Sequence, residues 1–291
     1  MILDTELPMV SVGIPTFNRP FGLKRTLENI TSQKYLNLEI IVSDNCSPNG
    51  DTEAIVKHFM QNDSRVFYYK QPTNIGAWEN FLFVLEKAQG EYFMWAADDD
   101  EWEDNFVTQC LCNMSGVGSV MCEFETVFRN HKTIIKNKIP HLGYSGSTHT
   151  DVSSFLKCMQ PTLIYGLHRR SNIQFALYED GFDFYDCYFV LKLILENGLR
   201  TIPGVNYRAG VDEIEYRVKT MDIVSGQLNY FPFTSSVIKI IWTSRKLTYG
   251  QKANLSILFL RIVLGLIIHH KQYNKTINFI IRTQNFFKRK I

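Results

Sequence analysis

Three adjacent aspartates, Asp98 to Asp100, follow the aromatic-rich run GEYFMWAA. Carboxylates this close repel one another, and either a solvated turn or a bound cation relieves the repulsion. The apolar run from Tyr92 to Ala96 predicts a buried strand directly before them. Carboxylates after a buried strand are typical of sites that hold Mg²⁺ or Mn²⁺ together with phosphate oxygens, because hard cations prefer oxygen ligands. The triplet therefore predicts a divalent cation as cofactor, with an acidic surface turn as the alternative.

Several other polar or charged residues could form hydrogen bonds or ion pairs with a charged ligand. Asp44 could accept a hydrogen bond from a nucleobase, or it could form a turn or a cap. Arg19 could meet a phosphate or a base, or it could be a solvated surface residue. Asn74 and Asn80 flank Gly76, where the backbone either approaches a ligand or turns sharply.

The elements that must position these residues alternate between strands and helices. Strands are predicted near residues 10–15, 38–43, 66–69 and 92–96, with helices between them, which is the pattern of a largely parallel α/β sheet covered by helices on both faces. Thr16–Arg19, Asp44–Ser47 and the aspartate triplet all follow carboxyl ends of these strands. Ligands bind at that edge of such sheets, so we expect one site there.

Four runs carry a resemblance to a known family: VSVGIPTFNRP, IIVSDNCS, NIGAWENF and GEYFMWAADDDEW. In order and spacing they resemble family 2 glycosyltransferases with the GT-A fold, above all bacterial enzymes that build surface polysaccharides such as O-antigen. The match covers about residues 9 to 106. It implies a GT-A domain over 1–221, with a nucleotide-binding half at about 1–115 and an acceptor half at about 116–221, and a helical C-terminal extension over 222–291.

The resemblance also implies roles for single residues around a nucleotide-sugar donor. The acidic motif of many members reads L-D-x-D-D, and here Ala97 replaces its first aspartate. Asp99 then falls on the metal-ligand position with Asp100 beside it, for Mn²⁺ or Mg²⁺. The remaining positions implied to bind the nucleotide sugar are Pro15, Thr16, Asn18, Arg19, Asp44 at the base, Asn74, Gly76, Asn80 and Asp98.

A second acidic motif supplies the catalytic base in inverting members, and FDFYDCYFVLK fits it loosely. Asp186 takes the position of the base, and Asp183, one helical turn earlier, is the runner-up. Considered alone, Asp186 could also be a helix cap. Gly210 stands where a histidine often follows, so the resemblance gives no third metal ligand. The resemblance implies direct displacement at the anomeric carbon by a glycan or lipid-linked acceptor.

Composition limits the partners and the compartment. A net charge of +2 on 291 residues gives no argument for nucleic acid. The six cysteines are scattered and form no C-x-x-C pair, which favours reduced thiols in a reducing compartment. The run MILDTELPMV does not resemble a secretory signal. We therefore expect a cytoplasmic protein.

The last part of the sequence is apolar and basic. The run ILFLRIVLGLII, residues 257–268, is shorter than the ~20 residues needed to cross a bilayer. With the basic residues between Arg282 and Lys290, it predicts peripheral contact with the cytoplasmic face of an inner membrane. Packing of these helices on the catalytic domain is the alternative.

Two other classes share some of these features. Nucleotidyltransferases use the same kind of sheet, but they carry a glycine-rich basic loop after the first strand, and PTFNRP is not one. A non-catalytic protein that binds nucleotide sugars is the second alternative, which Ala97 and the weak second motif would suit. A dinucleotide-dependent oxidoreductase is disfavoured, since no G-x-G-x-x-G follows the first strand.

Overall fold

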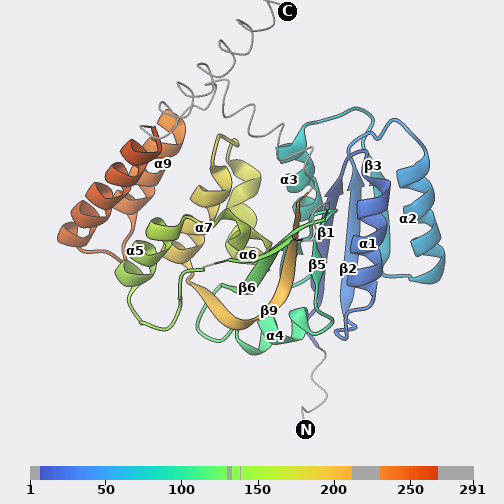
Figure 1. The fold of residues 1–291 in the computed structure, drawn as a ribbon, viewed down its shortest axis with the longest axis horizontal. Coiled ribbons are helices and arrows are strands. Elements are labelled where there is room, and N and C mark those ends of the chain that lie inside the picture. The colour runs from blue at the N-terminus through green and yellow to red at the C-terminus, as the bar shows by residue number, and fades with distance from the viewer. Residues whose placement is uncertain (1–6, 130–132, 138, 212–229, 268–291) are drawn as a thin grey trace, which may run out of the picture.

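The computed structural model describes residues 7–129, 133–137, 139–211 and 230–267 (Figure 1). Its first part confirms the predicted alternation of strands and helices. Pro20 opens the first helix, where its fixed φ suits the helical turn and its missing N–H is not needed. The elements are β1 Val10–Thr16, α1 Pro20–Thr31, β2 Leu38–Asp44, α2 Asp51–Asn62, β3 Val66–Lys70, α3 Ala77–Lys87 and β4 Tyr92–Trp95.

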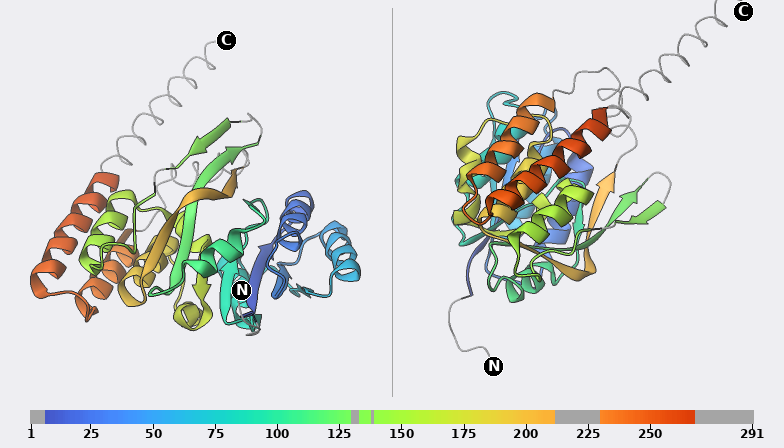
Figure 2. Two further views of the ribbon diagram at one scale, coloured as in Figure 1. Left: turned by 90° about the horizontal axis from the view of Figure 1, so that it is seen from below. Right: turned by 90° about the vertical axis from the view of Figure 1, so that its left-hand side faces the viewer.

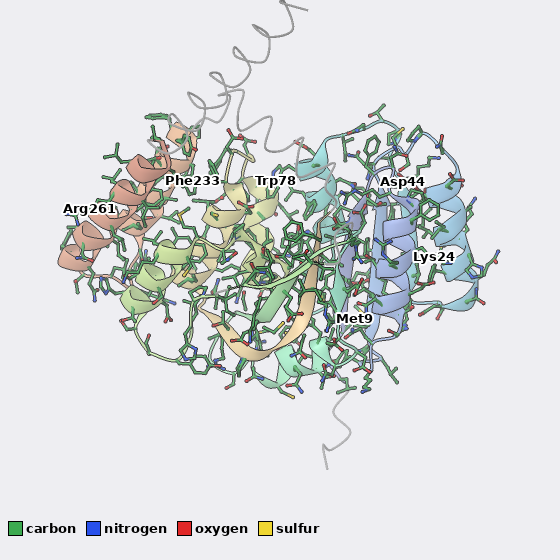
Figure 3. The ribbon with its side chains drawn as sticks, viewed as in Figure 1. Met9, Lys24, Asp44, Trp78, Phe233 and Arg261 are labelled. Carbon is green, nitrogen blue, oxygen red and sulfur yellow. The ribbon has the colours of Figure 1, made fainter. Side chains whose placement is uncertain are left out.

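These four strands are parallel and lie in the order β3-β2-β1-β4. Every residue of β1, β2 and β4 is buried, because helices cover both faces of the sheet. Figure 3 places Asp44, at the end of β2, on the edge of the molecule opposite Met9, which precedes β1. All the carboxyl ends therefore meet at one edge, as the sequence predicted.

The second part extends the same sheet with mixed strand directions. From β4 the order continues β8-β6-β9-β5, and β7 pairs with β6. The β6–β9 pair is parallel, whereas β8 and β5 run antiparallel to their neighbours. The elements are β5 Glu101–Trp102, α4 Phe106–Cys112, β6 Ser119–Phe128, β7 Thr133–Lys136, α5 Thr148–Cys158, a 3₁₀ turn Pro161–Tyr165, β8 Leu167–Arg169, α6 Arg170–Ile173, a 3₁₀ turn Gln174–Tyr178, α7 Tyr185–Glu196 and β9 Leu199–Val211.

The short strand β5 brings the aspartate triplet to distant parts of the chain. Trp102 of β5 lies opposite Tyr207 of β9, and their rings are 5.3 Å apart. The turn between β4 and β5, residues 96–100, is therefore held against the end of β9. The predicted halves, 1–115 and 116–221, share this one sheet, and their division stays a prediction.

The described chain ends in two helices, α9 Tyr230–Thr243 and the helix Tyr249–Ile267, which we call the C-terminal hairpin. The hairpin packs beside α7 at the end of the molecule opposite α2 (Figures 1 and 2). Phe233 contacts Phe259 across it, with ring centroids 5.4 Å apart. The helical extension is thus confirmed where it is described, and the predicted boundary at 221/222 lies outside the described residues.

Candidate active site

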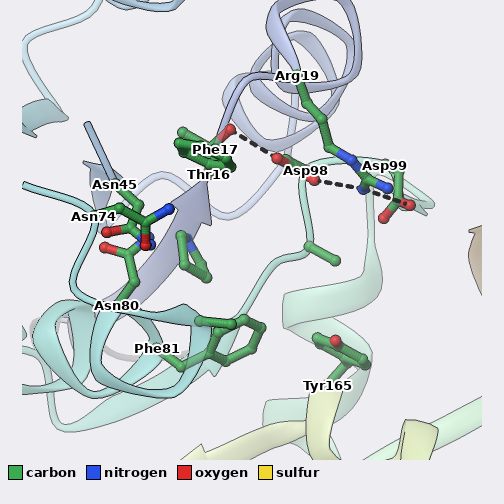
Figure 4. Close-up of a pocket in the computed structure, with 13 residues that line it drawn as sticks. Thr16, Phe17, Arg19, Asn45, Asn74, Asn80, Phe81, Asp98, Asp99 and Tyr165 are labelled. Carbon is green, nitrogen blue, oxygen red and sulfur yellow. Dashed lines mark hydrogen bonds and ion pairs between the residues drawn. The ribbon is translucent and has the colours of Figure 1, made fainter. Parts of the chain in front are cut away.

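A cavity of about 440 Å³ opens at the carboxyl ends of β1, β2 and β4 (Figure 4). It combines side chains from the loops after β1 and β4, from the start of α3, and from the 3₁₀ turn at Tyr165. Asp99 lies in its wall, and so does Asn45, which the sequence did not single out. Six of the residues predicted to bind a nucleotide sugar also line it: Pro15, Thr16, Arg19, Asn74, Asn80 and Asp98.

Asp98 and Asp99 share one positively charged partner. The Nη1 atom of Arg19 donates to Asp98 Oδ1 at 3.0 Å and to Asp99 Oδ2 at 2.9 Å. Thr16 Oγ1 donates to the other oxygen of Asp98 at 2.7 Å. Burial raises the pKa of Asp98 above its usual value, against the opposing effect of Arg19. The repulsion between these two carboxylates is thus offset by a cation of the protein itself.

Asp100 has a separate environment behind the cavity. Tyr207 donates its hydroxyl to Asp100 Oδ2, and the Gly210 N–H donates to Oδ1 at 2.8 Å. Burial raises the pKa of Asp100 well above its usual value, and the charge of Asp99 adds to the effect. The carboxylate joins the β4–β5 turn to β9 and is absent from the cavity wall. Its predicted role as a metal ligand stays a prediction.

Backbone contacts hold the triplet from two sides. Arg129 Nη2 donates to the Asp99 carbonyl at 2.6 Å. A Cβ on Gly22 would lie 2.2 Å from the Asp98 carbonyl oxygen, and a Cβ on Gly210 would lie 2.1 Å from that of Asp99. Only glycine therefore fits where α1 and β9 approach the turn. Gly210, which stands where relatives often carry a histidine, thus packs directly against the triplet.

We expect Gly22→Ala to destabilise the protein, although alanine normally favours a helix over glycine. The added methyl meets the Asp98 carbonyl, and overpacking of this kind costs about 1–3 kcal/mol. Gly265→Ala is the matched control, because the Cβ it would add in the helix Tyr249–Ile267 has no atom within 4 Å apart from its chain neighbours and the helix's own backbone. Urea unfolding of both variants measures the difference, and equal stability would contradict the close contact.

Asp44 lies at the end of β2 with both carboxylate oxygens engaged. Oδ1 accepts from the Ser47 N–H at 2.8 Å, and Oδ2 accepts from the Tyr68 hydroxyl at 2.9 Å. Asp44 therefore shapes the loop after β2 and is absent from the cavity wall. Ser47 in turn accepts from the Asn18 N–H at 2.8 Å, so the loops after β1 and β2 are joined. Contact of Asp44 with a nucleobase stays a prediction.

The predicted asparagines form the opposite wall. Asn45 Nδ2 donates to Asn74 Oδ1 and to the Gly76 carbonyl, both at 3.0 Å. Asn80 is buried and exchanges hydrogen bonds with the side chain and carbonyl of Ser43. Gly76 has a φ of +95°, which glycine adopts freely, and it caps the start of α3. It supports the wall without lining it.

A second cavity of about 300 Å³ adjoins the first and contains Asp186. Both cavities are lined by Ala77, Phe81 and Tyr165. Trp78 and Tyr185 line only the second, with ring centroids 4.2 Å apart. Asp183, the runner-up for the base, is absent from both walls. The structure thus brings Asp186 to the same edge as the aspartate triplet.

Tyr165 stands between the two cavities. It is held in a 3₁₀ turn, and burial raises its pKa, with further contributions from the charges of Asp100, Asp99 and Asp186. The side chain is therefore a neutral hydroxyl at the junction. Sequence reasoning missed it because residues 161–165 follow no helical or strand period.

The loop before Asp186 is tied to the C-terminal hairpin. Phe184 precedes α7 with a left-handed φ of 64°, a conformation that L-residues seldom adopt. Its ring lies 5.2 Å from that of Tyr230 and 5.4 Å from that of Phe233. These contacts hold in place a backbone conformation that is unfavourable by itself.

Asp98 and Asp99 suit a divalent cation that takes its other coordinating oxygens from phosphates. Among the described residues, no group of three or more His, Cys, Asp or Glu is arranged to enclose a metal ion. Asp98 and Asp99 do place oxygens within 3.0 Å of one cationic nitrogen, which shows that the position favours positive charge. One or two carboxylates are what Mg²⁺ and Mn²⁺ usually need when phosphates supply the other ligands.

Comparisons with known proteins agree on the class. Residues 11–186 match the family model "Glycosyl transferase family 2". A GalNAc(5)-diNAcBac-PP-undecaprenol beta-1,3-glucosyltransferase of Campylobacter jejuni is 26% identical over 250 residues, which span 69% of this chain and 79% of the relative.

Solved structures show the fold at low sequence identity. Staphylococcus aureus TarS 1–349 in complex with UDP-GlcNAc is 16% identical, with a TM-score of 0.63 over 87% of this chain and 71% of that one. The mannosyltransferase PcManGT of Pyrobaculum calidifontis, in complex with GDP-Man and Mn²⁺, has a TM-score of 0.50 over 93% of this chain and 84% of its own, also at 16% identity. The sheet described above is thus the GT-A fold.

Proposed function

Because the chain belongs to glycosyl transferase family 2, we propose that it moves a sugar from a nucleotide-diphosphate sugar to a glycan or lipid-linked acceptor, with inversion and with a divalent cation. The product would be part of a bacterial surface polysaccharide. The relative from Campylobacter, whose name specifies an undecaprenol-linked glycan, supports this class of acceptor. We place the reaction on the cytoplasmic side of the membrane.

One observation carries the proposal: two adjoining cavities hold carboxylates of different character at the same sheet edge. The first is polar, with Asp98, Asp99 and Arg19 at one side and asparagines at the other. The second has aromatic walls and a single aspartate, Asp186. A donor and an acceptor that react with each other need two such adjoining spaces.

The first cavity suits the donor. Asn45, Asn74 and Asn80 offer amide groups, and Arg19 offers a cation for phosphate oxygens. Asp99, with Asp98 beside it, would hold Mn²⁺ or Mg²⁺. When bound, the cation offsets the negative charge that develops on the departing diphosphate. Asp100, whose oxygens bond Tyr207 and Gly210, positions the turn.

The second cavity suits the acceptor. The rings of Trp78 and Tyr185 give an apolar wall against which one face of a sugar can pack. Asp186 Oδ would accept the proton of the acceptor hydroxyl as that oxygen attacks the anomeric carbon. The new C–O bond forms as the bond to the diphosphate breaks, and the pair of electrons leaves with the diphosphate. Attack from the side opposite the leaving group inverts the configuration.

The test combines a donor screen with product stereochemistry. UDP-, GDP- and dTDP-sugars are incubated with an undecaprenol-diphosphate glycan and Mn²⁺, and the anomeric configuration of the product is read by NMR. We expect transfer with one nucleotide sugar, opposite configuration in the product, and loss of transfer with EDTA. A product of retained configuration would overturn the inverting mechanism. Donor binding without any transfer would favour the non-catalytic alternative.

A further inference from the structure

The C-terminal hairpin exposes more apolar surface than its size accounts for. It contains only 38 of the 239 described residues. Yet it carries seven of the 18 large hydrophobic side chains that are exposed in the described part of the chain. Such concentrations of apolar surface usually mark a place where something else binds. By length and composition the helix Tyr249–Ile267 is also apolar enough to cross a membrane. Only 22% of its most apolar 18-residue stretch is buried in the protein.

This helix is apolar on two faces. Leu255, Phe259 and Val263 are buried against the protein, at a spacing of four residues. Ile257, Leu260 and Leu264, which we call the outward leucine face, are 53%, 48% and 58% exposed. At 3.6 residues per turn the two sets lie roughly 130° apart around the helix axis. A helix on a water-facing surface normally carries polar residues on its outer side, so the outward leucine face needs an apolar partner.

Charge identifies the kind of partner. The described hairpin contains five Lys or Arg residues and no Asp or Glu. In the sequence the last acid is Asp222, and the 69 residues after it contain 11 Lys or Arg. The first 222 residues therefore carry a net charge of −9, although the whole chain has +2. Apolar residues beside cations without acids are the composition that binds anionic lipid surfaces.

The packing determines how the helix would meet the lipid. Phe259 is fully buried and contacts Phe233, so a helix that crossed the bilayer would have to abandon this contact. Lying in the interface keeps the buried face on the protein and places only the outward leucine face in lipid. The exposed Arg261, next to Leu260, can extend its charged end to the headgroups.

A second copy of the chain is a poorer partner for this face. Two hairpins facing each other would bring five cations on each side together without an acid between them, and like charges repel.

We propose that the outward leucine face of the C-terminal hairpin docks on an anionic phospholipid bilayer, in the plane of its surface. The biological role of this docking, which is to bring the acceptor cavity near a lipid-linked glycan, rests on the proposed function. The hairpin touches the acceptor side through Phe184, two residues before Asp186. Docking itself requires neither donor nor acceptor.

Vesicle flotation of the full chain tests the docking. We expect binding to vesicles of phosphatidylcholine mixed with phosphatidylglycerol, weak binding to phosphatidylcholine alone, and release as salt is raised. Leu260→Gln with Leu264→Gln should reduce the partition coefficient on the order of tenfold or more. The matched control replaces two exposed leucines outside the hairpin, Leu7 and Leu36, by glutamine and should bind as the unchanged protein does.

The possible outcomes separate the partners. Equal binding of the Leu260/Leu264 variant and the control variant would overturn the proposal, and so would absence of binding to the mixed vesicles. Sedimentation equilibrium without lipid covers the second-copy alternative, since a dimer that only the Leu260/Leu264 variant loses would assign the face to self-association. Thermal unfolding of both variants checks that they fold. Because no sugar is present, vesicle binding can succeed even if sugar transfer fails.

Discussion

Asp186→Asn is expected to slow sugar transfer by several orders of magnitude while leaving donor binding intact. The asparagine keeps the shape of the side chain in the second cavity but cannot accept the proton of the acceptor hydroxyl. General base catalysis contributes on the order of 10²- to 10⁴-fold, so kcat should fall by that factor. The donor is expected in the first cavity, which Asp186 does not line, so its dissociation constant should not change. Single-turnover transfer and calorimetry with the donor measure the two effects.

Asp183→Asn is the matched control for this substitution. Asp183 lies three residues earlier and is absent from the walls of both cavities. We expect it to keep transfer within a few-fold of the unchanged enzyme. If Asp183→Asn is inactive and Asp186→Asn is active, the base is Asp183 and the second cavity is not the acceptor site.

Asp99→Asn is expected to remove the metal-dependent part of donor binding. Asp99 lies in the wall of the first cavity, and its carboxylate and that of Asp98 share the Arg19 nitrogen within 3.0 Å. Loss of the charge weakens the attraction for a divalent cation and removes one of the two carboxylates that face the Arg19 nitrogen. Electrostatic stabilisation by a metal supplies several kcal/mol in such reactions, so transfer should fall at least 10²-fold.

Manganese binding followed by electron paramagnetic resonance, with and without the donor, measures the change directly. Asp104→Asn is the control, because this acid is 49% exposed and pairs with Lys34 away from the cavity. The fold should survive both substitutions, as thermal unfolding without metal can show. Unchanged manganese affinity in Asp99→Asn would remove Asp99 from the metal site.

The sequence predicted the sheet, and the edge at which these polar residues gather, because both depend on local patterns. Apolar runs near residues 10, 38, 66 and 92 form parallel strands, and the polar residues after them meet at one edge. Thr16, Arg19, Asp98 and Asp99 lie together there, as their positions after the strands required. The alternation of elements carries this information without any knowledge of distant contacts.

What the sequence did not reveal depends on contacts between residues far apart in the chain. Tyr207 and Gly210 hold Asp100 from more than 100 positions away, and the sequence around them does not indicate this contact. The hydrogen bonds that Asp44 accepts from Tyr68 and Ser47 also could not be predicted, because a single aspartate in the sequence does not indicate its partners. Burial and pairing of a carboxylate are properties of the fold, and they decide which acids stay available to a ligand.

The left-handed Phe184 sets a rule for building hybrid enzymes. Its ring packs on Tyr230 and Phe233 of the C-terminal hairpin, while its backbone leads directly into α7 and Asp186. A transplanted hairpin without aromatic residues at these two positions would no longer support the ring and would release the unfavourable turn. A working chimera therefore has to exchange the start of α7 together with the hairpin, as one inherited unit.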